Sequence, residues 1–412
     1  MIIFLILLHT RGVRREGSVI CGVMGMKTKN TYSDAEVGFD IPALPGMDER
    51  EIQTPCLVID LDRFEINLKK MVDDLRPFNV TLRPHAKMHK SVDVARRQLA
   101  FNNTVGICCQ KVSEAEVFSR AGITDILITN QVCDAAKISR LCGIAQSGCR
   151  VTVCVDDLSN VNALATEARR QKTHIHCLVE LDCGAGRCGV TEPEQILELA
   201  LAIDGFSSLT FDGLQAYQGS IQHEKSYEKR EEVMGGVISQ VNSCVTSLRN
   251  AGLSCNVVSG GGTGTFLLEA ASGIYTEVQC GSYAFMDADY GRINNQTGQR
   301  LDQGQWENAL FLLTSVMSTA KTGQAVCDAG LKVQSVDSGL PTIFDRDDIR
   351  YVSCSDEHGV IEDKKNKLKL NDKLRLIPGH CDPTCNLHDW YVCVRSGKVE
   401  SLWPVSARGK AW

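Results

Sequence analysis

Short apolar runs rich in β-branched residues alternate with helical stretches from Val80 to Tyr283. A buried parallel strand reads as a short apolar run, whereas a surface helix repeats its apolar positions every three to four residues. Eight such runs occur, at residues 80–87, 104–110, 125–130, 150–156, 176–182, 211–219, 255–262 and 276–283. Helical patterns lie between them, for example at residues 91–100, 112–122, 134–145, 161–171 and 227–252. This alternation predicts a (β/α)8 barrel, with an open doubly wound sheet as the alternative.

Polar side chains collect at the carboxyl ends of these runs, the end that carries the active site in barrels of this kind. Turn preference explains Asn130 and Asp156, but it explains poorly a lysine, an arginine and a tyrosine at three separate strand ends. The candidates are His85, Lys87, His89, Gln110, Asp182, Arg187, Tyr217, Gln218, Ser259–Gly262, Ser282 and Tyr283.

The stretch "SGGGTGT", Ser259–Thr265, closes the seventh run and precedes a helical pattern. Consecutive glycines let backbone N–H groups approach a ligand closely, and a helix N-terminus adds a positive dipole. Barrels often bind phosphate between strands seven and eight, so this stretch predicts a phosphate cup, with a flexible turn as the alternative. The Lys-Ser/Thr pair of a Walker loop is absent from it.

The segment "RPHAKMHK", Arg83–Lys90, places a lysine at the end of the first run. A phosphate cup together with a strand-end lysine suggests pyridoxal phosphate, held by Lys87 as a Schiff base. In an extended segment His85, Lys87 and His89 share one face, whereas the rival Lys90 points the other way.

After Arg292 the pattern changes to strand-like alternation without helical periods, at residues 306–318, 367–379 and 389–403. This predicts a C-terminal β domain, joined by residues before Cys56. Within it, His380 and Asp382 in "PGHCDPTCNLHDW" are two residues apart, so both side chains can reach one point from an extended segment. Imidazole plus carboxylate suits Mn²⁺, Mg²⁺ or Zn²⁺, although such a pair taken alone is more often structural.

Composition narrows the class of protein. The 412 residues are 23% charged and 43% hydrophobic with a net charge of −6, which is typical of a globular protein and does not support nucleic-acid binding. The 19 cysteines lie in apolar stretches, which indicates reduced thiols in an intracellular, cytoplasmic protein. The apolar run Ile2–Leu8 is too short to span a membrane. Residues 1–45 are therefore predicted to be a disordered extension or an organelle-targeting segment.

Eight motifs in order resemble the D-threonine aldolase and D-serine dehydratase group, which are fold-type III pyridoxal-phosphate enzymes related to alanine racemase. The resemblance spans Thr54 to Trp390, and its motifs are at residues 54–68, 82–90, 106–116, 182–190, 216–220, 259–265, 279–291 and 378–390. It implies a pyridoxal-phosphate barrel at residues 56–292 and a metal-bearing β domain at residues 46–55 plus 293–412. It also implies a homodimer with each site near the interface.

The resemblance assigns roles residue by residue. Lys87 matches the Schiff-base lysine, Arg187 the arginine that contacts the cofactor's phenolic oxygen, and Tyr217 a pocket tyrosine. Gly261, Gly262 and Thr263 match the phosphate loop, helped by Gly281 and Ser282, and Gln110 is a further cofactor-binding candidate. His380 and Asp382 match the metal pair, His223 a catalytic base, and Asp356 is a candidate partner of the metal ligands.

The implied reaction is retro-aldol cleavage of a D-3-hydroxy amino acid, in which D-threonine gives glycine and acetaldehyde. The alternatives are a dehydratase of D-serine or 3-hydroxyaspartate and a non-catalytic pyridoxal-phosphate carrier. The dehydratases that the chain resembles have cysteine two residues after the histidine, whereas this chain has Asp382 there. A hard oxygen ligand suits Mn²⁺ or Mg²⁺ and favours the aldolase.

Overall fold

The computed structural model describes Tyr32 and residues 34–412, and residues 36–412 form one compact unit. The predicted extension falls largely outside the described residues, but its last part does not. Ile41 and Ala43 are buried, and the backbone N–H of Gln53 donates to the carbonyl of Pro42 at 2.9 Å. The prediction of disorder is therefore corrected for residues 41–43, where Ile41 and Ala43 pack into the unit, whereas Phe39 remains exposed.

The predicted eight-stranded parallel barrel is confirmed. The strands follow the order β2-β9-β8-β7-β6-β5-β4-β3, and the parallel bridges Leu82↔Thr104 and His85↔Cys108 join β2 to the segment of β3. The bounds are β2 Thr81–Leu82, β3 Ile107–Cys109, β4 Asp125–Gln131, β5 Arg150–Val155, β6 Ile175–Glu180, β7 Leu209–Gln215, β8 Val257–Gly260 and β9 Glu277–Val278.

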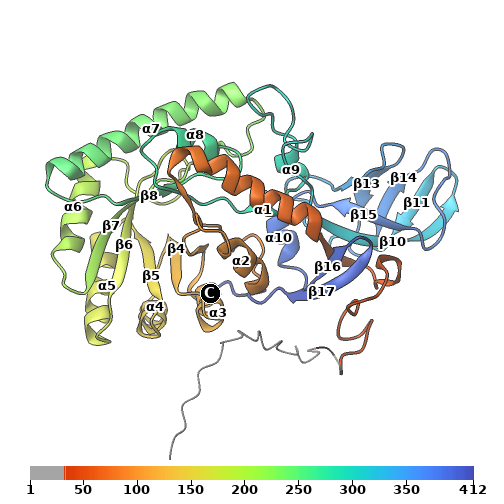
Figure 1. Ribbon diagram of the computed structural model, residues 1–412, viewed down its shortest axis with the longest axis horizontal. Helices are drawn as coiled ribbons and strands as arrows, with labels where there is room; N and C mark the ends of the chain where they lie inside the picture. Colours follow the sequence, from red (N-terminus) through yellow and green to blue (C-terminus); the bar gives the residue numbers. More distant parts are fainter. Residues whose placement is uncertain (1–31, 33) are drawn as a thin grey trace, which may run out of the picture. The chain divides into compact units, whose positions relative to one another are not determined.

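Helices cover the outside of the barrel strands (Figure 1). Their inward faces and the strands share one large apolar cluster, which includes Phe118, Leu141, Leu164 and Leu199. The bounds are α1 Leu61–Leu75, α2 Val92–Leu99, α3 Val112–Arg120, α4 Ala135–Gln146, α5 Leu158–Arg170, α6 Pro193–Asp204, α7 Tyr227–Asn250 and α8 Phe266–Ala271, with the short helices η1 Glu49–Glu51, η2 Arg76–Phe78, η3 Ser282–Ala284 and α9 Ala288–Gly291.

A second, mostly antiparallel sheet forms the C-terminal domain. Its main path is β13-β14-β11-β10-β1-β16-β17, with β15 paired to β10 and β12 paired to β15. The bounds are β1 Cys56–Asp60, β10 Leu310–Lys321, β11 Gln324–Cys327, β12 Thr342–Ile343, β13 Arg350–Cys354, β14 Gly359–Glu362, β15 Lys373–Ile377, β16 Trp390–Arg395 and β17 Lys398–Pro404, with helix α10 Cys381–Cys385.

Strand β1 corrects the expected domain boundary at Cys56. It pairs antiparallel with β10 and parallel with β16, so the N-terminal part of the second domain extends to Asp60. Strand β1 was assigned to the barrel because it is buried on both faces. Its sequence is therefore a continuous apolar run, like those of the barrel strands that follow.

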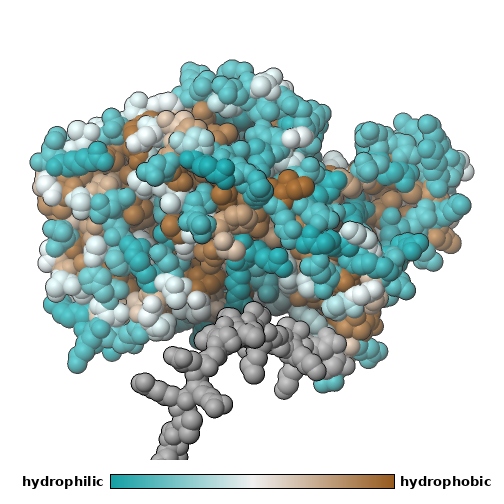
Figure 2. Space-filling view, in the orientation of Figure 1, coloured by the Kyte–Doolittle hydropathy of each residue, from teal (hydrophilic) through white to brown (hydrophobic). Residues whose placement is uncertain are grey.

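Apolar and polar residues are interspersed on the face drawn in Figure 2. Among the described residues, none of the helices is both long enough and apolar enough to cross a lipid bilayer.

Candidate active site

A pocket of about 310 Å³ lies at the carboxyl ends of the barrel strands and reaches helix α10 of the second domain. Every residue that the motifs assign to the cofactor, the catalytic base or the metal pair lines the pocket except Gly261, whereas the strand-end candidates His89, Asp182, Gln218, Ser259, Gly260 and Tyr283 do not line it. The assigned residues that line it are Lys87, Gln110, Arg187, Tyr217, His223, Gly262, Thr263, Gly281, Ser282, His380 and Asp382. Segments that are remote in sequence therefore bring an amine, a glycine loop and an imidazole–carboxylate pair into one cavity.

Lys87 lies in a turn, not in an extended segment. His85 makes the last bridge of this strand, and residues 86–89 form the turn. His85 and Lys87 both line the pocket, but His89 is fully buried elsewhere, where its Nδ1 accepts from the Ser91 backbone N–H at 3.0 Å. The expectation that His89 shares the face of Lys87 is therefore wrong, because the turn rotates it away. Lys90 does not line the pocket.

His85 is held as a neutral imidazole beside Lys87. Its Nε2 lies 3.0 Å from Thr129 Oγ1 and 3.4 Å from Gln110 Nε2. Burial lowers the pKa of His85 well below its usual value, and the positive charge of Lys87 lowers it further. The ring can therefore accept or donate one hydrogen bond at the pocket wall without adding charge.

The glycine loop leaves backbone exposed on the pocket side because Gln222 fills the space behind it. A Cβ on Gly262 would lie 2.4 Å from Gln222 Oε1, so a larger residue there would require the Gln222 side chain to move. Gly261 has φ +76°, and its Cβ position faces Val278 and Glu269, which explains why it supports the loop without lining the pocket.

The Thr263 hydroxyl accepts from the Tyr283 backbone N–H at 3.1 Å and so ties this loop to Ser282 and its neighbours. Helix α8 has only six residues, so its dipole is weak. A phosphate at this loop would therefore be bound mainly by hydrogen bonds from backbone N–H groups.

Arg187 and Tyr217 come from the loops after β6 and β7. Asp182 Oδ1 accepts from the backbone N–H groups of Gly184, Ala185 and Gly186, which folds the loop that carries Arg187. Burial raises the pKa of Tyr217, so its hydroxyl stays protonated. Both side chains face the pocket.

The imidazole–carboxylate pair of the second domain passes a simple distance test. His380 Nε2 lies 3.9 Å from Asp382 Oδ1. Two atoms that each bind one ion at about 2.1 Å lie at most about 4.2 Å apart, so both atoms are within reach of one shared divalent cation. No group of three or more His, Cys, Asp or Glu side chains suited to a metal occurs in residues 34–412. Further ligands of an ion here would therefore come from groups other than these four side-chain types.

The partner of His380 is not the one predicted. Asp356 is exposed on the turn between β13 and β14, where its carbonyl accepts from the Lys332 backbone N–H at 3.0 Å. Asp337 instead accepts from His380 Nδ1 at 2.8 Å. Burial alone would lower the pKa of His380, but Asp337 and the charges of Asp382 and Asp287 outweigh it and raise that pKa.

His223 has a carboxylate partner of its own. Its Nδ1 lies 2.7 Å from Asp289 Oδ2, and its ring centroid lies 5.0 Å from that of Tyr290. The side chain is 44% exposed and lines the pocket, so Nε2 is the nitrogen left for a ligand. Sequence reasoning missed Asp289, although it lies in the motif at residues 279–291.

Two further pocket residues that the sequence did not single out are Gln215 and Gln279. Each amide donates to the other, with N···O distances of 3.1 and 2.7 Å, and both line the pocket. Their position at the ends of β7 and β9 was the available signal, since other strand-end residues were selected on that ground.

Each of the two domains matches a known protein family. Residues 59–289 match the alanine racemase N-terminal domain, and residues 309–394 match a serine dehydratase domain. The crystal structure of D-threonine aldolase from Filomicrobium marinum superposes with a TM-score of 0.87 at 42% identity, covering 90% of this chain and 100% of that one.

Three curated relatives cover most of the chain. The 3-hydroxy-D-aspartate aldolase of Paracoccus denitrificans (strain Pd 1222) is 59% identical over 94% of this chain and 100% of that protein. The D-threonine aldolase of Arthrobacter sp. is 44% identical over 89% and 96%. The D-threo-3-hydroxyaspartate dehydratase of Delftia sp. (strain HT23) is more distant, 29% identical over 81% and 92%. A solved variant of a dehydratase of that name is described as metal-free.

Proposed function

Because the chain belongs to the alanine racemase N-terminal domain family and to its aldolase members, we propose that it cleaves D-3-hydroxy amino acids in a metal-activated, pyridoxal-phosphate-dependent retro-aldol reaction. The chain is a carbon–carbon lyase with the fold of the fold-type III pyridoxal-phosphate enzymes. The observation that carries the proposal is the convergence of Lys87, the glycine loop, His223 and the His380–Asp382 pair on one pocket.

The cofactor site fits pyridoxal phosphate. Lys87 supplies the amine that binds the cofactor's aldehyde carbon, and the glycine loop with Thr263 and Ser282 supplies donors for its phosphate. Arg187 and Tyr217, on the loops after β6 and β7, would contact its ring. Pyridoxal phosphate bound here would supply an electron sink for the pair released when the Cα–Cβ bond breaks.

His223 is the proposed proton acceptor for the substrate's β-hydroxyl. Asp289 holds its Nδ1, which fixes the tautomer with a free lone pair on Nε2 facing the pocket. Removal of the hydroxyl proton pushes electrons toward the carbonyl that leaves as the aldehyde. No base is required at the α-hydrogen, and this distinguishes cleavage from dehydration.

His380 and Asp382 would hold the divalent ion, which acts as a Lewis acid toward the β-hydroxyl oxygen. A nitrogen and a carboxylate oxygen favour Mn²⁺ or Mg²⁺ over the softer thiolate chemistry of zinc, with Zn²⁺ as a further candidate. A solved dehydratase variant is described as the metal-free form, which implies that this relative also has a metal-bound form.

Two substrates stand out within the class. The motifs predict D-threonine, which gives glycine and acetaldehyde. The relative at 59% identity instead acts on 3-hydroxy-D-aspartate by its name, and cleavage of that substrate gives glycine and glyoxylate. The D-serine or 3-hydroxyaspartate dehydratase remains the weaker alternative, because its representative is only 29% identical.

Product analysis tests the reaction. Purified enzyme with pyridoxal phosphate and Mn²⁺ is given D-threonine, 3-hydroxy-D-aspartate or D-serine. We expect glycine and the matching aldehyde in equal amounts from the first two, and no reaction with L-threonine. Ammonia with 2-oxobutanoate from D-threonine, or faster pyruvate formation from D-serine, would move the chain to the dehydratases.

A chelator tests the metal. We expect EDTA to abolish turnover while the cofactor's visible absorption persists, because His380 and Asp382 are placed to meet substrate oxygen. Asp382→Ala should behave in the same way. Loss of the cofactor together with the metal would indicate a structural ion.

The homodimer and the intracellular location stay predictions.

A further inference from the structure

Asp337 lies on the irregular loop between β11 and β12, far in sequence from the helix that carries Asp382. It accepts a hydrogen bond from His380 Nδ1 at 2.8 Å. Because this bond occupies Nδ1, the Nε2 lone pair is the one directed to the pocket, 3.9 Å from Asp382 Oδ1. A histidine that binds a metal through one nitrogen usually donates its other N–H to a carboxylate or carbonyl.

The Asp337 carboxylate is itself fixed by its neighbours. Its Oδ1 accepts from the Ser335 hydroxyl at 2.6 Å, and its Oδ2 accepts from His380 at 2.8 Å and from the Ser338 hydroxyl at 3.5 Å. The Ser335 backbone N–H donates to the Thr384 hydroxyl at 3.1 Å, and that hydroxyl donates to the His380 carbonyl at 2.7 Å. Thr384 is fully buried within helix α10. The loop and the helix with Asp382 therefore form one hydrogen-bonded unit around the His380 side chain.

We propose that Asp337 is a positioning residue of the metal centre, which holds the His380 imidazole with Nε2 directed at the ion shared with Asp382. The inference rests on the proposed function, because it requires that these two residues bind a divalent cation. Asp337 need not touch the ion, since its side chain bonds to the remote nitrogen of the ring.

The arrangement explains why two protein ligands suffice. A flexible histidine paired with one carboxylate must lose rotational freedom when it binds a metal, and that loss weakens binding. In this chain the Asp337 bond has already restricted the ring. The carboxylate also makes the imidazole a stronger electron donor, which favours a cation at Nε2.

The test is a Mn²⁺ titration of the holoenzyme, in which free Mn²⁺ is followed by electron paramagnetic resonance. Asp337→Ala should weaken Mn²⁺ binding by about 10- to 100-fold. Asp337→Asn keeps an acceptor oxygen for Nδ1 but lacks the charge. Its affinity for Mn²⁺ should therefore lie between that of the wild type and that of Asp337→Ala. Asp356→Ala is the matched control, an exposed aspartate of the same domain, and should bind Mn²⁺ as the wild type does.

Turnover separates positioning from ligation. Saturating Mn²⁺ should restore most of the kcat of Asp337→Ala, because both ligands remain, whereas Asp382→Ala should stay inactive. The cofactor's absorption and the unfolding curve check that each variant is folded, and Asp337→Asn serves if the alanine variant is not. Failure of the wild type to bind Mn²⁺ would refute the proposed metal. A wild type that binds, with Asp337→Ala within twofold of it, would refute the positioning role alone.

Discussion

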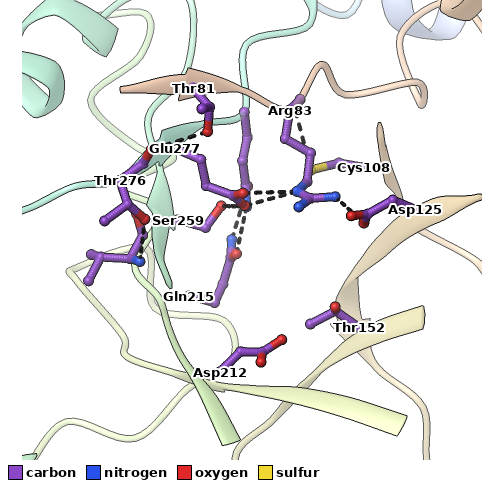
Figure 3. Close-up of polar contacts among 12 residues, drawn as sticks. Thr81, Arg83, Cys108, Asp125, Thr152, Asp212, Gln215, Ser259, Thr276 and Glu277 are labelled. Carbon is purple, nitrogen blue, oxygen red and sulfur yellow. Dashed lines mark hydrogen bonds and ion pairs between the residues drawn. The ribbon is translucent and has the colours of Figure 1, made fainter. Parts of the chain in front are cut away.

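At the amino-terminal ends of the barrel strands, charged side chains pair with one another, whereas at the carboxyl ends polar groups face an open pocket. Arg83 donates through Nε to Glu277 at 3.0 Å and through its terminal nitrogen to Asp125 at 2.6 Å (Figure 3). Nearby, Arg150 donates to Asp212 at 2.5 Å. In the pocket, by contrast, Lys87, Arg187 and Asp382 converge on free volume.

The difference shows why polar composition alone does not identify a site. Burial alone would lower the pKa of Arg83, but Glu277 and Asp125 outweigh it and raise that pKa, so the cation is fully compensated. An apolar layer that includes Cys108, Leu127 and Leu178 lies inside the barrel between its ends. Charges on one side of this layer are paired with one another, and groups on the other side face the pocket and remain available for chemistry.

The largest effect should come from Lys87→Ala. Removal of the amine should lower turnover by at least about a thousandfold, or about 4 kcal/mol in the barrier, without unfolding the protein. Borohydride reduction of the wild type should fix the cofactor to Lys87, as peptide mapping would show. Lys111→Ala changes an exposed lysine and should leave both readouts unaltered. An adduct on Lys90 or Lys111 would contradict the assignment.

Arg83→Ala tests the opposite end of the barrel. It would leave the Glu277 carboxylate, only 3% exposed as a residue, without its cation, so the free energy of unfolding should fall by about 3–5 kcal/mol. Urea unfolding measures this loss. Arg170→Ala removes the surface pair with Glu167 and should cost less than about 1 kcal/mol. If Arg83→Ala abolished catalysis but not stability, the distinction between the two ends would fail.

Glu269 introduces a pH dependence at the pocket end. It lies behind the glycine loop, where burial raises its pKa to about 7 and its Oε2 has no hydrogen-bond partner among the described residues. The folded state therefore binds this proton more tightly than the unfolded state does. The resulting stability is present below about pH 4.5 and is lost as the pH rises through about 7, a loss of about 3 kcal/mol.

Glu269→Gln stays neutral and should remove this loss. Urea unfolding of the wild-type and variant holoenzymes at pH 5 and pH 8 gives the change in the free energy of unfolding for each protein. The contributions of the other titrating groups are the same in both proteins, so they cancel in the difference. The wild type should lose about 2–3 kcal/mol more than the variant over this interval. Equal losses in the two proteins would show that Glu269 does not titrate there.

The sequence predicted the barrel and most of the pocket for identifiable physical reasons. Buried parallel strands and amphipathic helices have distinct periods, and their carboxyl ends necessarily meet, so Lys87, Arg187, Tyr217 and the glycine loop could be placed together. The motifs of the family supplied His223 and the His380–Asp382 pair, which no periodicity indicates.

What the sequence missed depends on contacts between segments with no local pattern. Asp337 reaches His380 from an irregular loop 43 residues away. His89 was misplaced because a turn after Pro84 breaks the strand's alternation. The Arg83–Glu277 pair joins residues 194 positions apart, and only the closed barrel brings them together.

The smallest expected effect concerns Ser259, which connects the two ends. Glu277 is paired with Arg83, so the Ser259 hydroxyl donates its hydrogen to Glu277 Oε1 at 2.5 Å. The Ser259 oxygen then accepts from Gln279 Nε2 at 2.7 Å, and this fixes which way the Gln279 amide faces at the pocket floor.

Ser259→Ala should cost about 1–2 kcal/mol of stability, because buried polar groups lose a partner. It should also weaken pyridoxal-phosphate binding a few-fold, since the paired amides of Gln215 and Gln279 can then rotate. Thr152→Val removes a buried hydroxyl that accepts from Arg150 at the charged end, so cofactor affinity should not change. Equal cofactor affinities in both variants, measured by absorbance titration, would show that the charged end does not influence the pocket.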